Sequence, residues 1–168
     1  MRGKILVAVA ALAAVALSSG CSSEAADDGG LPSADSMKAA HEYVNTYAAC
    51  GPVDPNSEEG SKSAAAKDPA WSIEERGVCE DASGRTITLL RTKDMAAFQR
   101  AVQREGGRGL LVGQDFAVEP TGDESIAALL KSDLMYLNCD PDDEVPSGYE
   151  KEEALVDGCW LTKYVNLT

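Results

Sequence analysis

The first twenty residues determine how much of this 168-residue chain has to fold, and in which compartment. Residues 1–4 carry two positive charges, and residues 5–17 form an unbroken apolar run that is followed by small residues and Cys21. A basic start, an apolar stretch of about 7–15 residues and a small-residue exit are typical of a secretory signal peptide. The run is shorter than the roughly 20 apolar residues that a membrane-spanning helix needs. We therefore expect residues 1–20 to be an export signal.

The end of this run favours one kind of signal peptide. Residues 17–21 (LSSGC) resemble the lipobox of bacterial lipoproteins, although Ser18 stands where an aliphatic residue is expected and Leu17 lies one place earlier. The resemblance implies that the Cys21 thiol receives a diacylglyceryl group and that Cys21 becomes the new N-terminus. Two acyl chains anchor a protein stably, whereas one chain binds only marginally. We expect a lipid-anchored protein at the extracytoplasmic face of the cell membrane. The alternative is a soluble secreted protein.

The segment behind Cys21 differs in composition from the rest of the chain. Residues 21–33 are small, polar and acidic, and we expect them to form a flexible tether. Removal of 20 residues leaves 168 − 20 = 148, which suits a single domain over residues 34–168. All 28 acidic residues but only 13 basic ones follow position 20, so the mature charge is 13 − 28 = −15. Such a surface repels nucleic acid and anionic headgroups, so we expect membrane contact only through the lipid.

The remaining cysteines are Cys50, Cys79, Cys139 and Cys159. An even number in an exported chain predicts structural disulfides. Four cysteines allow three pairings, and the sequence does not choose among them, although proximity favours Cys50–Cys79 with Cys139–Cys159. The chain has no CxxC spacing, which argues against a redox-active dithiol, and a zinc site made from these thiols would be unusual outside the cytoplasm.

Hydrophobic periodicity predicts an α+β fold. We expect helices at residues 33–49, 92–104 (capped by Thr92) and 121–130 (with a capping box at its start), and a short helix at 150–156. We expect strands at residues 73–79, 85–91, 110–112, 116–118, 134–138 and 160–165. Residues 85–138 then match the ferredoxin-like βαββαβ order, a small antiparallel sheet with helices on one face. A helix would precede this unit, and a disulfide-closed extension would follow it. Residues 51–70 are a surface segment, either a binding loop or disordered.

Several of these features occur together in one known group of proteins. Cys50 closes the first helix, Cys79 and Gly84 precede a β-branched strand, a helix ends at Gly106-Gly107, and residues 111–113 (LVG) precede an aromatic-containing strand. This order resembles small uncharacterised lipoproteins of actinomycete type, over residues 39–130. Those proteins commonly have Trp where Phe116 stands, and the tail after Asn138 departs from them. The resemblance implies an envelope location and a Cys50–Cys79 bridge, and it implies no activity.

No pattern in the sequence indicates a catalytic centre or a cofactor. His41 is the only histidine, and we interpret it as an ordinary residue at a helix surface. Asp140, Asp142 and Glu144 belong to the densest carboxylate cluster and are weak calcium candidates. An EF-hand counted from Asp142 would need glycine where Ser147 stands.

Two functional hypotheses remain. The first is a non-catalytic module that binds a protein or another cell-envelope ligand, or supports a neighbouring membrane complex. The second is a small envelope hydrolase whose acids, Asp142 or Glu144, come together only in the folded protein. The hydrolase needs a concave site that holds two carboxylates.

Overall fold

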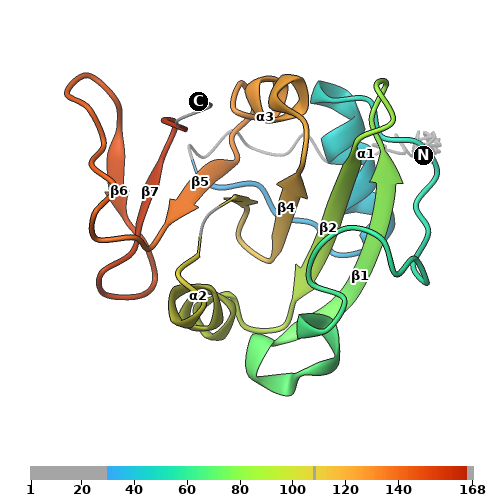
Figure 1. Ribbon diagram of the computed structural model, residues 1–168, viewed down its shortest axis with the longest axis horizontal. Helices are drawn as coiled ribbons and strands as arrows, with labels where there is room; N and C mark the ends of the chain where they lie inside the picture. Colours follow the sequence, from blue (N-terminus) through green and yellow to red (C-terminus); the bar gives the residue numbers. More distant parts are fainter. Residues whose placement is uncertain (1–29, 108, 166–168) are drawn as a thin grey trace, which may run out of the picture.

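The computed structural model describes residues 30–107 and 109–165, so the expected signal peptide, Cys21 and most of the expected tether lie outside the described residues. In this part, seven strands form one antiparallel sheet in the order β1-β2-β4-β3-β5-β7-β6 (Figure 1). The strands are β1 (Ile73–Glu80), β2 (Thr86–Thr92), β3 (Leu110–Val112), β4 (Phe116–Pro120), β5 (Met135–Asn138), β6 (Lys151–Glu153) and β7 (Trp160–Thr162). The helices are α1 (Met37–Tyr47), α2 (Met95–Arg104) and α3 (Asp123–Leu129), with 3-10 turns η1 (Ala65–Lys67) and η2 (Pro69–Trp71). The expected α+β class is confirmed.

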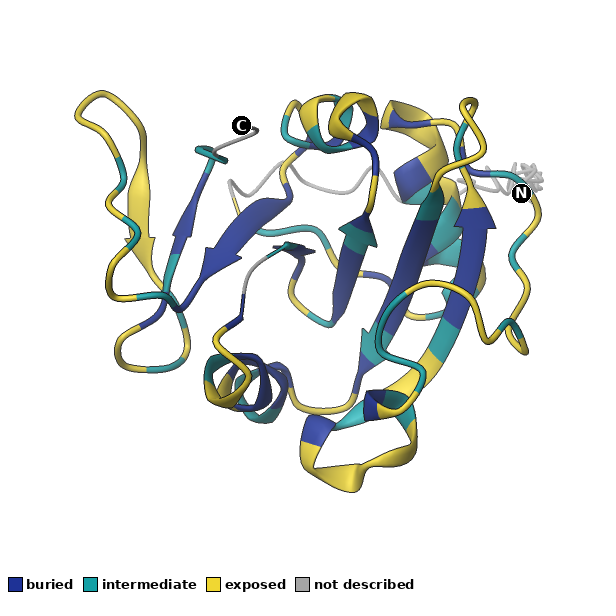
Figure 2. Ribbon diagram, in the orientation of Figure 1, coloured by how far each residue is buried: buried dark blue, intermediate teal, exposed yellow. Residues whose placement is uncertain are grey.

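The central strands are buried on both faces (Figure 2). Side chains alternate along a strand, so Leu90 packs with α2 on one face while Leu89 packs with α1 and α3 on the other. On the α2 face, Trp71 from η2 also meets Phe98, with ring centroids 5.8 Å apart. The expectation that the helices cover one face is therefore wrong. Ile87 and Leu89 are buried on one face of β2 and Leu90 is buried on the other, so a helical layer on a single face would leave apolar side chains of β2 in water.

Residues 85–138 follow the expected order of strand, helix, two strands, helix and strand, yet the ferredoxin-like plan is not confirmed. In space these strands run β2-β4-β3-β5, with β5 paired to β3. On its other side, β2 is paired with β1 from Ile73 to Glu80. Strands joined by a tight turn pair readily, and the turn after Glu80 places β1 there.

Two expected helix caps are wrong. Asp94, rather than Thr92, caps α2, because its side chain accepts the Ala97 N–H while Thr92 is the last residue of β2. Helix α3 begins after Gly122 without a side-chain cap of its own. The Thr121 hydroxyl, expected to cap it, donates to the Thr86 carbonyl instead. Thr92 and Thr121 therefore contribute to the sheet and not to the helix caps.

The expected helix at residues 150–156 is also wrong, because Lys151–Glu153 forms strand β6 and pairs with β7. All three residues of β6 are exposed, so the segment has no apolar stripe that a helix could bury. The Cys139–Cys159 bridge closes the segment at its base, which holds it beside β7. The last strand ends at Thr162, earlier than expected.

The chain is fixed to the domain from Leu31 onward, inside the range expected to form the tether. The Gln114 backbone N–H donates to the Pro32 carbonyl at 2.7 Å, and the Gln114 side chain donates to the Leu31 carbonyl. This close approach occurs over Gly113, where an added Cβ would lie 2.4 Å from the Pro32 oxygen. The glycine that allows the β3–β4 turn therefore also allows the N-terminal segment to dock.

Candidate functional site

Both disulfides join the cysteines that are nearest in sequence. Cys50 and Cys79 are bonded with Cα atoms 5.4 Å apart and are buried, so they link the end of the α1 region to β1. Cys139 and Cys159 are bonded with Cα atoms 4.1 Å apart, at the end of β5 and just before β7. The favoured pairing is confirmed, including the Cys50–Cys79 bridge that the family resemblance implied. The second bridge closes residues 140–158 into a loop, which we call the arm.

The arm extends from the edge of the sheet opposite β1 (Figure 1). It contains one basic residue, Lys151, and eight acidic ones: Asp140, Asp142, Asp143, Glu144, Glu150, Glu152, Glu153 and Asp157. Its net charge of 1 − 8 = −7 is nearly half of the −15 expected for the mature chain. The acidic character of the protein is thus concentrated in one short projecting segment.

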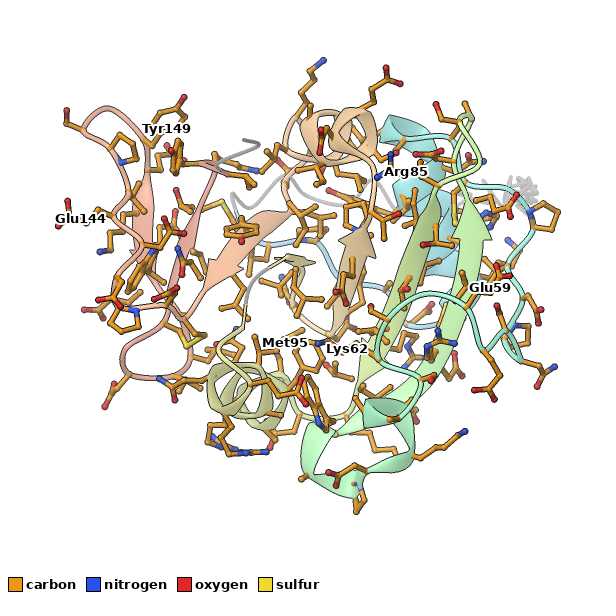
Figure 3. All side chains as sticks on the ribbon, in the orientation of Figure 1. Glu59, Lys62, Arg85, Met95, Glu144 and Tyr149 are labelled. Atoms are coloured by element: carbon orange, nitrogen blue, oxygen red, sulfur yellow. A yellow bond between two sulfur atoms is a disulfide. The ribbon has the colours of Figure 1, made fainter. Side chains whose placement is uncertain are left out.

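The carboxylates at the start of the arm are used in part to fold it. The Asn138 side-chain amide donates to Asp143 at 2.8 Å, and the Asp142 N–H donates to the Asp140 carboxylate at 2.9 Å. Glu144 points away from the body (Figure 3). Across residues 30–107 and 109–165, no group of three or more His, Cys, Asp or Glu side chains is placed to hold a metal ion. The calcium candidates Asp140, Asp142 and Glu144 therefore gain no support from the geometry.

The arm also exposes apolar side chains. Tyr149 is 53% exposed and Leu155 is 65% exposed, and they lie just before and just after β6. The third exposed large hydrophobic residue in the described part is Tyr47 on α1. The Tyr149 ring contacts the Tyr164 ring, with centroids 4.9 Å apart. Exposed apolar groups beside charged ones are typical of interaction surfaces.

Two lysines lie near the base of the arm, and one of them, Lys151, joins the arm to strand β7. Lys151 Nζ lies 4.0 Å from the centroid of the Trp160 ring, a cation–π contact across the β6–β7 pair. Lys163, just after β7, donates to the carbonyls of Ser132 and Leu134. Burial lowers the pKa of the Lys163 ammonium, while the charges of Asp133, Glu150 and Glu152 oppose that shift. The base of the arm is therefore a defined structure.

The surface segment at residues 51–70 is held against the sheet, so the disordered interpretation finds no support. The Arg76 guanidinium donates to the carbonyls of Ser57, Glu59 and Ser61. Asp54 forms a β-bridge with Val78, which covers the outer edge of β1. Figure 3 shows Glu59 and Lys62 on this segment.

Shallow depressions surround this segment, and they do not contain the acids expected for a hydrolase. A depression of about 430 Å³ is lined by Asp54, Glu59, Glu80 and Asp81 among others. A depression of about 300 Å³ lies over Arg76 and Glu74. Asp142 and Glu144 line neither of these, nor the smaller one beside Ser125.

His41 has a structural contact. Its Nε2 lies 2.9 Å from the Cys50 carbonyl oxygen, which links α1 to the disulfide that follows it. Because the ring bonds to the backbone of its own segment, the contact accounts for the residue without any catalytic role. The interpretation of His41 as an ordinary helix residue agrees with this position.

No protein-family model, curated protein or solved structure matches this chain. Among the residues that the structure describes, no helix has the length and hydrophobicity to cross a membrane.

The sequence pattern did not indicate that residues 151–153 form an edge strand. The segment Lys151–Glu153 was expected to be helical, which would have satisfied its backbone groups internally. As a strand it pairs with β7, and no other described strand pairs with it. The exposed charged triplet beside Tyr149 was the available signal, since three consecutive charged residues fit an edge strand as well as a helix.

Proposed function

We propose that this protein is a lipid-anchored, extracytoplasmic binding module without catalytic activity, and that the arm is its binding surface. The anchor is Cys21, for the reasons given from the signal sequence. The observation that carries the proposal is the arm itself: a disulfide-closed acidic projection with exposed Tyr149 and Leu155 at the free end of the sheet. The partner is an unidentified protein or envelope ligand.

The energetics of the arm support this assignment. In the chain-entropy model, a bridge that closes a loop of about 20 residues stabilises the folded state by about 3 kcal/mol. The arm encloses no core of its own, because its residues are mostly exposed. A stabilised segment that contributes little to the core fits a role in presenting a surface.

The hydrolase alternative has less support. A hydrolase needs two carboxylates that face one substrate in a concave site. Asp142 and Glu144 belong to the exposed arm and line none of the three depressions described above. One of these depressions is lined by several acidic residues, including Asp81. The Asp81 carboxylate already accepts hydrogen bonds from its own turn and from Ser125 at the start of α3.

Intact mass of the membrane-extracted protein tests the anchor. We expect cleavage before Cys21, the added mass of a diacylglyceryl group, and a mass gain on reduction that corresponds to two disulfides. A Cys21→Ser variant should leave the membrane fraction. An unmodified peptide that spans position 21 in the mature protein would overturn the anchoring.

Site-specific photo-crosslinking in cells tests the arm. A benzophenone amino acid replaces Tyr149 or Leu155 on the arm, and Tyr47 on α1 serves as the matched exposed control. We expect a discrete crosslinked product from the arm positions and none from position 47. Products from position 47 alone, or none from either arm position, would overturn the arm as the binding surface.

A further inference from the structure

The sheet has two edge strands, and within the described residues a further backbone pairing is present at one of them. At β1, Asp54 bridges Val78 and the Gly51 N–H donates to the Glu80 carbonyl, so residues 51–70 shield that edge. At the other edge, β6 pairs with β7 alone, and no described strand lies on its outer side. Exposed edges present unpaired backbone groups to an incoming strand.

The register shows which backbone groups face outward. Glu152 lies opposite Leu161, and the Ala154 N–H donates to the Cys159 carbonyl two residues further along. In an antiparallel pair, hydrogen-bonded and non-hydrogen-bonded positions alternate. The N–H and C=O groups of Glu152 therefore face β7, while those of Lys151 and Glu153 face away from the sheet.

The charges at this edge determine which side chains an added strand should carry. Side chains alternate along a strand, so Glu152 lies on one face of β6, where its charge also acts on Lys163, and Glu153 lies on the other face. A second copy of the chain would bring these carboxylates against one another, and like charges on adjacent strands are destabilising. A strand with consecutive basic side chains would meet a carboxylate on each face. Lys151 lies on the same face as Glu153, and its ammonium is directed over Trp160 on β7, which is the side away from the open edge.

Exposed apolar side chains flank the edge. Tyr149 precedes β6 and Leu155 follows it, so both ends of an added strand would meet an apolar contact. Interfaces commonly combine such contacts with charges that determine register and partner. The edge thus offers backbone pairing, charge and apolar contact together.

We propose that β6 binds an extended, lysine- or arginine-rich segment of a partner protein as an eighth strand of the sheet. This inference rests on the proposed function, since it assigns a partner chemistry to the arm. Backbone pairing would supply affinity, and Glu152 and Glu153 would supply selectivity for consecutive basic residues.

The test measures binding of the full-length protein to a synthetic peptide, acetyl-Thr-Val-Lys-Arg-Lys-Val-Thr-amide, at low ionic strength. A second peptide has the same sequence with N-methyl groups at alternate residues, which keep the charge and block edge pairing. A third peptide has Glu in place of its basic residues. We expect binding of the first peptide, about tenfold weaker binding of the N-methylated one, and no binding of the acidic one.

A matched pair of variants tests the edge from the protein side. Proline is tolerated on an edge strand where its missing N–H would face solvent, so Glu153→Pro removes one outward donor and leaves the β7 pairing. Glu153→Gln removes the same charge and keeps the donor. We expect Glu153→Pro to weaken binding of the basic peptide about tenfold, and clearly more than Glu153→Gln does.

The outcomes separate this inference from the proposed function. Equal binding of the plain and N-methylated peptides would overturn strand addition, as would no binding of the basic peptide. Either result would leave the crosslinking test of the arm unaffected. Because the peptide comparison needs no variant, it holds even if Glu153→Pro fails to fold.

Discussion

The Asp81 carboxylate accepts a hydrogen bond from the Ser125 hydroxyl at 2.6 Å, which joins the β1–β2 turn to the first turn of α3. The same carboxylate accepts the backbone N–H groups of Ser83 and Arg85 within its own turn. Asp81 therefore organises a hairpin and contacts a helix that begins without a cap of its own.

This relationship predicts acid-sensitive stability. The hydrogen bond from Ser125, followed by that from the Arg85 N–H, lowers the pKa of Asp81. The folded state thus keeps the carboxylate ionised at a pH where the unfolded chain binds a proton. The stabilisation is present above the ordinary carboxyl pKa of about 3.9 and is lost as the pH falls through the lower folded pKa.

Asp81→Asn should destabilise the fold at pH 7 by about 1 kcal/mol. The difference from the wild type should shrink in strong acid, and urea unfolding at both pH values measures it. Asp142→Asn, on the exposed arm, is the control and should have little effect at either pH. An Asp81→Asn deficit that persists unchanged in strong acid would contradict the assignment.

Arg76→Met should release the surface segment at residues 51–70, because its guanidinium holds three backbone carbonyls of that segment. We expect a loss of about 2–3 kcal/mol, since bonds to a charged donor are stronger than neutral ones. Limited trypsin digestion followed by mass spectrometry should show faster cleavage after Lys62 and Lys67. Arg100→Met, on the exposed side of α2, provides the comparison, and equal cleavage in the two variants would argue against the role of Arg76.

The two disulfides should differ in what their removal exposes. Replacing either pair by serine should cost about 3–4 kcal/mol in the chain-entropy model. Without Cys139–Cys159, we expect faster hydrogen exchange mainly within residues 140–158. Without Cys50–Cys79, exchange should also rise in β1 and β2, because those sulfurs pack with Ile87 and Leu89. Hydrogen-exchange mass spectrometry distinguishes the two patterns. Identical exchange patterns in the two variants would contradict the expectation that the two bridges stabilise different regions.

Lys163→Met should lower stability by about 1–3 kcal/mol at pH 7, because the Ser132 and Leu134 carbonyls lose their donor. Burial lowers the pKa of Lys163, so between that pKa and about 10.5 the unfolded chain binds more protons than the folded one. The stability of the wild type relative to the variant should therefore rise with pH across this interval. Urea unfolding near pH 7 and near pH 10 measures the change. Lys131→Met, which removes a lysine at an exposed position, is the matched control for the loss of stability at pH 7.

Much of the secondary structure could be predicted because it depends on neighbours in the sequence. The alternating and β-branched residues of β2, the helical spacing of Met95, Phe98 and Val102, and Gly113 in the β3–β4 turn are local signals. The caps were mistaken where a hydroxyl had a better partner from another strand, as Thr121 has in the Thr86 carbonyl.

The acidic charge follows from composition alone, and the spacing of the cysteines favoured the pairing that the structure has, although it left three pairings open. Only the tertiary structure placed helices on both faces of the sheet and turned residues 151–153 into an edge strand. Which strands become neighbours depends on contacts between apolar surfaces that are far apart in the sequence. Local sequence patterns do not encode those contacts. The edge position of β6 has the same origin, because β7 pairs with it on one side and no described strand pairs with it on the other.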